Sequence, residues 1–310
     1  MFYNQLNDII IKEDSWIETL PLQISAHSFH IRKMSIMEVN KYNEPIYIVC
    51  VLYNELISGI RSLDTFLSVV NDFEYVKLIV LDNSKDEIVQ ENIKLWETTY
   101  SKTILYASNN GNVGLSKAYN NALKMIKDDS YWIMISDDDT LFSKEYIYNV
   151  IKATEINKTD IISGIVLSSK KTISPAKKLG IPVKYIHEPG IYTNIFCINS
   201  GLTIKSNIFD KIGLYDEHLF LDGIDHLFSD KLIANGLNNI EIVPGNISQC
   251  FSAEVNDYYS KKARIKIYSK DWFNWWKASH KHTFFIFASI IIENISVVKR
   301  FFMKILGLRK

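Results

Sequence analysis

Three consecutive carboxylates, Asp137, Asp138 and Asp139, are the side chains of this sequence best suited to chemistry. They follow the run Tyr131 to Ile135, whose apolar and aromatic residues are typical of a strand buried on both faces. Adjacent acids repel one another and disfavour a strand, so we expect them where the strand ends, around a divalent cation or strong hydrogen-bond donors. The alternative is a solvated acidic turn that caps a helix beginning near Ser143.

The triplet does not begin an EF-hand calcium loop. Counted from Asp137, the sixth residue is Phe142 instead of glycine, and the twelfth is Tyr148 instead of glutamate. In an open α/β sheet, ligands bind at the carboxyl ends of central strands, which is where the triplet is expected. Its composition and its predicted position therefore both favour a ligand-binding role.

The segments before the triplet alternate between strand and helix patterns. Ile46 to Tyr53 is a continuous apolar run of strand length, and strands are also expected at Val76 to Leu81 and Thr103 to Ala107. A helical pattern follows each run, the last one from Leu115 to Ile126. This alternation predicts right-handed βαβ units and a mainly parallel sheet flanked by helices.

Beyond Ser143 the pattern is weaker. Residues 168–195 lose periodicity and carry three prolines, which indicates a loop region. The other expected elements are a helix after Ser143, strands at Asp160 to Leu167, Asn199 to Lys205 and Ile240 to Val243, helices at Ser206 to Ile212 and from Asp222 to Asn235, a loop at Gly213 to Phe220, and a helical remainder from Asp257.

Polar residues end the first two strands and precede the third helix. Asn54 follows the first run, Asp82 to Ser84 follow the second, and Gly111 and Gly114 lie in the loop before Leu115. Glycines at a helix N-terminus let the backbone approach an anion, which the helix dipole favours. A plain left-handed turn at the glycines, and a turn or N-cap at Asp82 to Ser84, are the simpler alternatives.

Composition bounds the class of protein. The 310 residues are 47% hydrophobic, enough for a large core, and 35 basic residues balance 35 acidic ones, so no global charge recruits nucleic acid. Cys50, Cys197 and Cys250 are far apart and lie in apolar contexts, which favours buried thiols in a reducing cytoplasm over disulfides or a zinc site. The first residues lack the basic and apolar regions of a signal peptide, so we expect the protein to stay inside the cell.

Taken together and in this order, these segments resemble the GT-A fold of family 2 glycosyltransferases, in particular the bacterial rhamnosyltransferase-like branch that builds surface polysaccharides such as O-antigen and capsule. The resemblance covers residues 46 to 280, and its motifs are weak singly but specific in combination. It implies an α/β fold with a Rossmann-like, mainly parallel sheet flanked by helices and a helical C-terminal appendage. The expected parts are a leader packing on the core (1–44), a catalytic domain (45–256) with a nucleotide-binding half (45–140) and an acceptor-side half (141–256), and a basic-aromatic C-terminal region (257–310).

The resemblance also implies roles for individual residues. Those implied in binding the donor nucleotide are Tyr53, Asn54, Asp82, Asn83, Asn110, Gly111, Asn112, Gly114 and Asp138. Asp137 and Asp139 look like the family's Asp-x-Asp and would hold Mn²⁺ or Mg²⁺, which stabilises a departing diphosphate as a Lewis acid. Those implied on the acceptor side are Ser200, Gly201, Tyr215 and Asp216, although packing is the favoured role of Tyr215.

An inverting transfer also needs a base, which in the family is an acid shortly before the helix after the acceptor segment. The matching residue is Asp225, and Asp222 is a close competitor; either could instead cap the helix. The chain departs from the family at Leu227, where a second acid is common, and at Ser248 to Phe251, where many members have a histidine near the metal. The first departure weakens the assignment of the base. The second leaves the metal with fewer protein ligands, or implies that it depends on water and diphosphate. Single structural hydrogen bonds, not metal ligation, are expected for the nearby histidines, His218 and His226.

The C-terminal region combines aromatic and basic residues. Its longest apolar run, Thr283 to Ile292, is too short to span a bilayer, and Glu293 interrupts it. Helices of this composition lie in the interface of anionic membranes, where a lipid-linked acceptor would be found. The alternative is a helical hairpin packed on the domain or in a homo-oligomer interface.

The sequence thus predicts a metal-dependent inverting glycosyltransferase at the inner face of the cell membrane, with dTDP-rhamnose as the first donor and a lipid-linked oligosaccharide as acceptor. UDP-galactofuranose or UDP-hexose donors, and a sugar-nucleotide-binding protein without catalysis, remain as alternatives. A dinucleotide-dependent oxidoreductase is disfavoured because Asn54 to Leu56 follow the first strand without a glycine-rich fingerprint.

Overall fold

The computed structural model describes residues 43–178, 183–249, 258–279 and 282–305. The leader expected at residues 1–44 lies almost entirely outside them, as does Cys250. Within the described part, Cys50 and Cys197 are buried free thiols, as their apolar surroundings predict.

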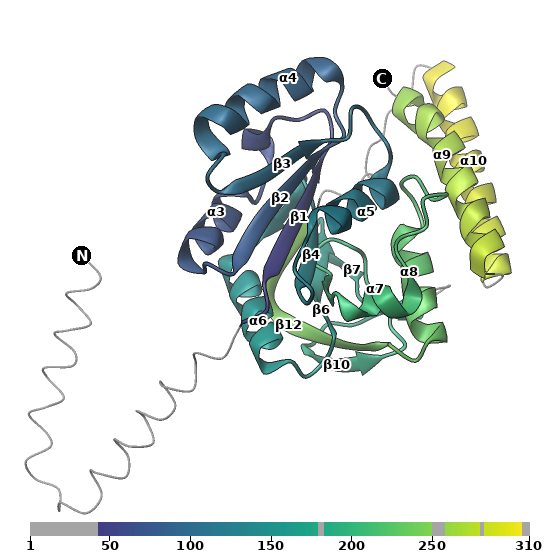
Figure 1. The fold of residues 1–310 in the computed structure, drawn as a ribbon. Coiled ribbons are helices and arrows are strands. Elements are labelled where there is room, and N and C mark those ends of the chain that lie inside the picture. Colours follow the sequence, from purple (N-terminus) through teal and green to yellow (C-terminus); the bar gives the residue numbers. More distant parts are fainter. Residues whose placement is uncertain (1–42, 179–182, 250–257, 280–281, 306–310) are drawn as a thin grey trace, which may run out of the picture. The chain divides into compact units, whose positions relative to one another are not determined.

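The first half of the domain is the predicted parallel sheet (Figure 1). Its strands are β1 (Ile46–Leu52), β2 (Val76–Asp82), β3 (Ile104–Ser108) and β4 (Trp132–Asp137). They pair in parallel in the order β3-β2-β1-β4. The connecting helices are η2 (Ile57–Gly59), α3 (Leu63–Asp72), α4 (Asp86–Leu95) with its π-helical extension η3 (Trp96–Tyr100), and α5 (Leu115–Met125).

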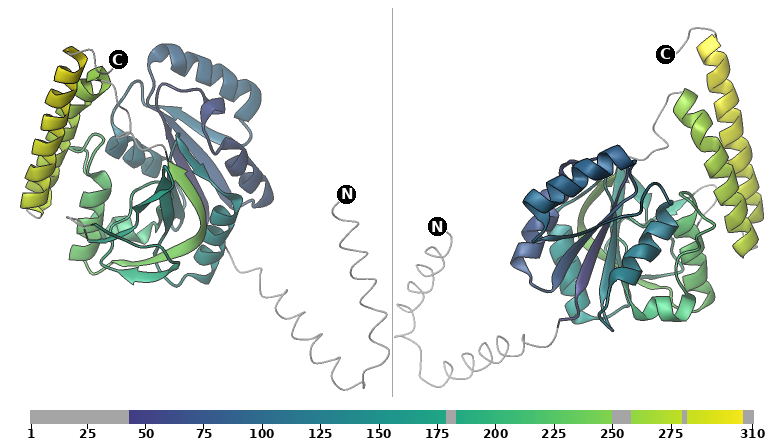
Figure 2. Two further views of the ribbon diagram at one scale, coloured as in Figure 1. Left: turned by 180° about the vertical axis from the view of Figure 1, so that it is seen from behind. Right: turned by 45° about the horizontal axis from the view of Figure 1, so that its top comes forward.

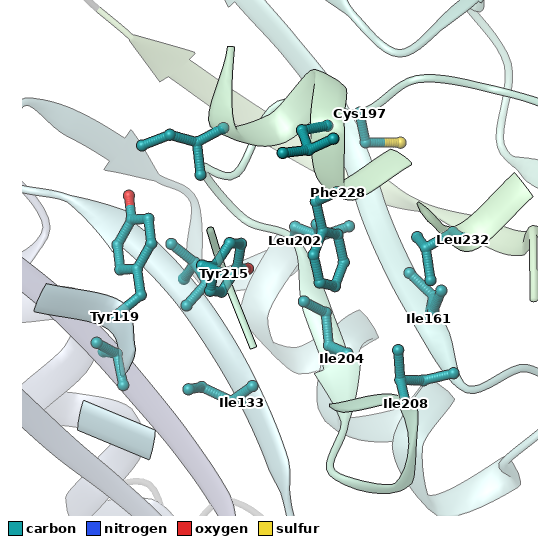
Figure 3. Close-up of a cluster of buried hydrophobic side chains, with 14 of the residues drawn as sticks. Tyr119, Ile133, Ile161, Cys197, Leu202, Ile204, Ile208, Tyr215, Phe228 and Leu232 are labelled. Carbon is teal, nitrogen blue, oxygen red and sulfur yellow. The ribbon is translucent and has the colours of Figure 1, made fainter. Parts of the chain in front are cut away.

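Strand β1 is buried along its whole length because the sheet is covered on both faces. Its alternate residues Tyr47, Val49 and Val51 belong to one core cluster, while Ile46, Ile48, Cys50 and Leu52 belong to the other. Side chains of successive strand residues point to opposite faces, so a continuous apolar run is what two cores require. Figure 3 shows part of the first cluster, in which β4, β6 and α8 contribute Ile133, Ile161 and Phe228.

The second half extends this sheet with strands of mixed direction. Its elements are β5 (Thr140–Phe142), α6 (Lys144–Ile156), β6 (Ile161–Ser168), β7 (Lys171–Ser174), β8 (Ala176–Lys178), β9 (Lys184–Tyr185), β10 (Gly190–Thr193), β11 (Thr203–Lys205), α7 (Asn207–Ile212), α8 (Ile224–Ala234) and β12 (Asn239–Gln249). Strand β11 lies antiparallel between β4 and β6, and β12 runs parallel to β6. The α/β, mainly parallel fold predicted from the sequence is confirmed.

Three local predictions were wrong. Where a loop was expected at residues 168–195, the described residues 168–178 and 183–195 contain the short strands β7, β8, β9 and β10. The strand expected from Asn199 begins only at Thr203, because Gly201 has a φ of 86° and turns the chain. The strand expected to end at Val243 continues to Gln249 through a register shift between Val243 and Ile247.

The C-terminal appendage is a helical hairpin of α9 (Tyr258–Ser279) and α10 (Thr283–Ile305), which lie side by side in all views (Figures 1 and 2). Helix α9 also packs on the domain, because Trp275 is fully buried and its indole N–H donates to Asp230 of α8 at 2.8 Å. In the part of the chain that the structure covers, no helix is long and apolar enough to cross a membrane.

Candidate active site

The register of the parallel strands brings the predicted polar residues to one edge of the sheet. Leu52 of β1 is paired with Asp82 of β2, and Val51 of β1 is paired with Asp137 of β4. Asp82 is in turn paired with Ser108, the last residue of β3. The chain segments that follow these four strands therefore begin at the same level, as expected for the carboxyl edge of an α/β sheet.

Asp137 ends β4 and is held by three side chains from other segments. Its Oδ2 accepts hydrogen bonds from the Ser200 hydroxyl at 2.5 Å and from Gln249 Nε2 at 2.8 Å, and its Oδ1 accepts one from the Tyr119 hydroxyl at 3.2 Å. Burial raises the pKa of Asp137, and the negative charge of Asp225 raises it further. Asp225 thus lies in the electrostatic surroundings of the triplet, although it belongs to α8.

Asp138 and Asp139 carry perturbed carboxyl groups. Burial, together with the charges of the neighbouring acids, raises the pKa of each to about 6. Asp138 accepts a hydrogen bond from the backbone N–H of Tyr53 at 3.0 Å, which ties the triplet to the end of β1. The Oδ1 atom of Asp139 is buried and has no hydrogen-bond partner.

The acids do not cap the helix that follows them. The hydroxyl of Ser143 caps α6 itself, by accepting a hydrogen bond from the N–H of Tyr146 at 3.2 Å. The alternative that the acidic turn caps the helix beginning near Ser143 is therefore wrong.

Two buried oxygens beside Asp137 lack partners. They are Oδ1 of Asp139 and Oε1 of Gln249, whose Nε2 is already engaged by Asp137. Carboxylate and amide oxygens are hard ligands of the kind that Mg²⁺ and Mn²⁺ take in proteins, so these residues fit a divalent cation. Among the described residues, no group of three or more His, Cys, Asp or Glu side chains is arranged to hold a metal.

On the donor side, the carboxylate of Asp82 is used in hydrogen bonds to other protein groups in this structure. Its carboxylate is fully buried and accepts hydrogen bonds at 2.8 Å from the Ser84 N–H, the Asn92 amide and the Tyr106 hydroxyl. The contact with ribose or base that the resemblance implies for Asp82 stays a prediction. Asn92 was not singled out from the sequence, since an asparagine inside an amphipathic helix gives no signal by itself.

Amide side chains link the other predicted donor residues. Asn83 accepts a hydrogen bond from Asn109 at 2.8 Å and donates one to the Gly114 carbonyl at 3.4 Å. Asn112 accepts one from the Gly114 N–H at 3.0 Å. Asn54 donates its backbone N–H to Ser84 at 2.8 Å, and Asn54 and Asn110 both have positive φ, 53° and 54°. These contacts hold the predicted donor loop in one conformation.

The two glycines of this loop differ. At Gly114, with φ of 85°, an added Cβ would lie 2.7 Å from the ring of Phe220 and 2.8 Å from its carbonyl oxygen. At Gly111, with φ of 113°, a Cβ would meet nothing within 4 Å. Gly114 is thus required by packing as well as by backbone conformation, whereas Gly111 leaves open space beside the N-terminus of α5.

The two candidate bases have different surroundings. Asp222 forms an ion pair with Arg264 of α9 at 2.7 Å, and burial raises its pKa even though Arg264 lowers it. Asp225, in the first turn of α8, is half-buried, and its Oδ1 accepts a hydrogen bond from the N–H of its neighbour His226 at 2.8 Å. Leu227, where a second acid was sought, is 4% exposed and belongs to the core.

The acceptor-side residues do not form one cluster. Ser200 and Gly201 lie beside the triplet, through the Ser200 hydrogen bond to Asp137 and the Gly201 N–H bond to the carbonyl of Ile135 at 2.8 Å. Tyr215 is instead a core residue, stacked on Phe228 at a ring distance of 4.9 Å (Figure 3). Asp216 accepts a hydrogen bond from His218 at 2.8 Å, and His226 stacks on Trp275 at 4.8 Å.

The sequence and the fold of this chain are similar to those of known proteins. The sequence model described as Glycosyl transferase family 2 matches residues 47–213, more than half of the 310-residue chain. The dTDP-rhamnosyl transferase RfbF of Shigella flexneri is 23% identical over 209 residues, which are 65% of this chain and 67% of that protein.

Two solved structures share the fold. GalNAc-T7 with UDP, GalNAc and Mn²⁺ superposes with a TM-score of 0.53 at 14% identity, over 68% of this chain and 45% of that one. The mannosyltransferase PcManGT from Pyrobaculum calidifontis, in complex with GDP-Man and Mn²⁺, superposes with a TM-score of 0.51 at 11% identity, over 88% of this chain and 81% of that one. The chain therefore spans less than half the length of the GalNAc-T7 chain.

Proposed function

Because this chain belongs to glycosyl transferase family 2 and is therefore a nucleotide-sugar glycosyltransferase with the GT-A fold, we propose that it is an inverting, metal-dependent enzyme that transfers rhamnose from dTDP-rhamnose to a lipid-linked surface polysaccharide. The observation that carries the mechanism is the 2.7 Å hydrogen bond from the Leu115 N–H to the Phe220 carbonyl, which holds the segment leading into α8 and Asp225 against the N-terminus of α5 at the donor edge of the sheet. A base and a set of donor-binding acids at one sheet edge are what a single displacement requires.

Asp225 is assigned as the base. Its carboxylate accepts the proton of the acceptor hydroxyl while that oxygen attacks the anomeric carbon, and the bond to the diphosphate breaks with its electron pair on the leaving group. Asp222 is less suited, because Arg264 already compensates its charge at 2.7 Å. The core position of Leu227 leaves the proton transfer to Asp225 itself.

The cation is assigned to the triplet. Asp137 and Asp139, with the free Oε1 of Gln249, would hold Mn²⁺ or Mg²⁺. When bound, such an ion supplies positive charge that stabilises the diphosphate leaving group. Both superposed structures contain Mn²⁺, which supports the choice of metal.

The loop before α5 is assigned to the diphosphate. Gly111 leaves open space there, and the N–H groups and dipole of a helix N-terminus favour an anion. Asn83 and Asn112 brace this loop through Gly114 and so keep its backbone in place.

The proposal of rhamnose as the donor sugar is based on the similarity to one relative. RfbF is named a dTDP-rhamnosyl transferase, and its 23% identity supports rhamnose as the first donor to test. UDP-galactofuranose and UDP-hexoses are the alternatives within the same fold, since the superposed structures hold UDP and GDP-Man. A protein that binds a sugar nucleotide without transferring it is the alternative outside catalysis.

Association with the inner face of the cell membrane is the last part of the proposal. Large apolar side chains of α10 are exposed, among them Phe284 at 88% and Ile295 at 61%. Lys277 lies over the ring of Phe273 at 4.6 Å, so a cation and an aromatic meet on α9. Apolar and basic groups together favour an anionic lipid surface, where a lipid-linked acceptor resides.

The test is a donor screen. Purified protein is incubated with dTDP-rhamnose, UDP-galactofuranose and UDP-hexoses and with Mn²⁺ or Mg²⁺, and released nucleoside diphosphate is measured with and without EDTA. We expect one donor to be turned over and EDTA to abolish this turnover. Asp225→Asn and Asp139→Asn should each lower the rate by at least about 100-fold. The control Asp64→Asn changes an exposed acid on α3 and should leave the rate unchanged. Donor binding without turnover in the presence of lipid acceptor would favour the binding protein, and no binding of any donor would contradict the proposal.

A further inference from the structure

Asp271 of α9 is a fully buried carboxylate with an unusual set of partners. It accepts three backbone hydrogen bonds from consecutive residues, Phe220 at 3.1 Å, Leu221 at 2.7 Å and Asp222 at 2.9 Å. Successive backbone N–H groups that converge on one anion form a site in which charge and geometry are both satisfied. The loop 220–222 is thus shaped around a side chain of the C-terminal hairpin.

The same loop contacts the proposed donor site. The carbonyl of Phe220 accepts the N–H of Leu115, the first residue of α5, at 2.7 Å. The ring of Phe220 fills the space that a side chain at position 114 would need. The peptide unit between Phe220 and Leu221 therefore makes both contacts. Its N–H donates to Asp271, and its carbonyl accepts from the N-terminus of α5, where the diphosphate is expected.

The other end of the loop leads to the proposed base. Asp222 is held both by Asp271, through its N–H, and by Arg264 of the same helix, through its carboxylate at 2.7 Å. Gly223 follows with φ of 75°, and α8 begins at Ile224 with Asp225 in its first turn. The position of Asp225 therefore depends on where Asp271 fixes the loop.

We propose that Asp271 is a positioning residue that sets the donor-side end of α5 and the base on α8 relative to each other. It acts through the backbone of residues 220–222 and touches no reacting group. The inference rests on the proposed function for the roles of Asp225 and of the α5 N-terminus, but the coupling itself is a property of the fold. It also makes α9 part of the active site's framework in addition to its place in the hairpin.

The coupling is tested first without substrate, by hydrogen exchange of the full-length protein. The variant is Asp271→Asn, which keeps the shape but loses the charge, and the matched control is Lys270→Ala, an exposed neighbour on α9. We expect faster exchange in Asp271→Asn in two places, the loop 214–223 and the start of α5, with the rest of the sheet unchanged. Faster exchange in the loop alone would overturn the link to α5.

The kinetic arm uses the donor that the screen identifies. We expect Asp271→Asn to lower kcat by about 100-fold, as a displaced catalytic group does, to raise the donor KM several-fold, and to keep a cooperative thermal transition. Asp271→Glu, which restores the charge one methylene too far, is expected not to rescue kcat. Loss of activity in proportion to unfolded protein, or rescue by glutamate, would overturn the positioning role. If Asp271→Asn speeds exchange both in the loop and at the start of α5, but the wild-type protein turns over no donor, the result counts against the proposed function and not against the coupling.

Discussion

The three acids of the triplet give the protein a defined dependence of stability on pH. The pKa values of Asp138 and Asp139 are raised to about 6, above the value of about 4 that aspartate has in an unfolded chain. Between these values the folded state binds more protons than the unfolded state, so stability falls as pH rises from about 4 to about 6 and stays lower above that.

We therefore expect Asp139→Asn to stabilise the protein at pH 7.5 in the absence of metal. Since the group is partly exposed, the gain is about 1 kcal/mol, or about 2 °C in Tm. At pH 3 the difference nearly disappears because the acid is then largely protonated in both states. Calorimetry of the variant beside Asp64→Asn at both pH values checks this, and an equal Tm at pH 7.5 would contradict it.

A bound cation reverses this dependence of stability on pH, because metal binding requires ionised carboxylates and so becomes stronger as the pH rises. We expect the rise in Tm caused by Mn²⁺ in the presence of a nucleoside diphosphate to grow between pH 5 and pH 7.5. It should be absent in Asp139→Asn at every pH. A shift of the same size in the variant would place the ion elsewhere.

Gln249 is the last residue of β12 and contacts the triplet directly. Its amide is oriented by the 2.8 Å bond from Nε2 to Asp137, which leaves Oε1 buried and unpartnered beside Asp139. We expect Gln249→Ala to weaken Mn²⁺ binding about tenfold, as measured by titration of the free Mn²⁺ signal in electron spin resonance. Asn246→Ala, at an exposed position of the same strand, is the control; unchanged Mn²⁺ affinity in Gln249→Ala would exclude Gln249 as a ligand.

At the level of elements, the junction between the Gly114 loop and Phe220 decides where α5 begins. Gly111→Ala and Gly114→Ala both impose a positive φ on alanine, but only the second brings a Cβ against Phe220. We expect a loss of about 1 kcal/mol for Gly111→Ala and about 3 kcal/mol for Gly114→Ala. Urea unfolding measures both, and equal losses would mean that the contact with Phe220 costs nothing.

The elements that were predicted and those that were missed differ in burial. Strands β1, β2 and β4 were evident because two cores require continuous apolar runs. Strands β7 to β10 are short and partly exposed, so they lack such a signal. Strand β12 passes through Pro244 and Gly245, which normally end a strand, and Gln249 was not singled out as a candidate ligand for this reason.

The candidate site residues that the sequence offered lie at the ends of elements. The triplet begins at the last residue of β4, the donor loop precedes α5, and Asp225, which the family resemblance suggested, lies in the first turn of α8. The partners of Asp271 are about fifty residues away in sequence, and an aspartate in a basic-aromatic helix gives no sign of them. Such contacts depend on tertiary structure and could not be read from local patterns.

At the level of the whole molecule, the hairpin of α9 and α10 has two distinct sides. Trp272 and Trp275 of α9 and Ile286 of α10 are buried in the main core. Phe284, Ile291, Ile295 and Val298 of α10 are between 54% and 88% exposed. Their spacing of seven, four and three residues places these four side chains on one face of the helix. Packing on the domain, the alternative to membrane contact, is thus combined with a free apolar face.

This division predicts that membrane binding and folding can be separated. We expect the double substitution Ile291→Lys and Ile295→Lys to abolish flotation of the protein with vesicles that contain anionic phosphatidylglycerol, because it places two charges in the apolar face. Its Tm should be close to that of the wild type, since both side chains are exposed. Ile191→Lys, an equally exposed isoleucine on β10, is the matched control and should bind vesicles normally. The contrary outcome is a wild-type protein that does not bind the vesicles and sediments as a dimer, while the double variant sediments as a monomer. That result would assign the apolar face to an interface between two copies of the chain.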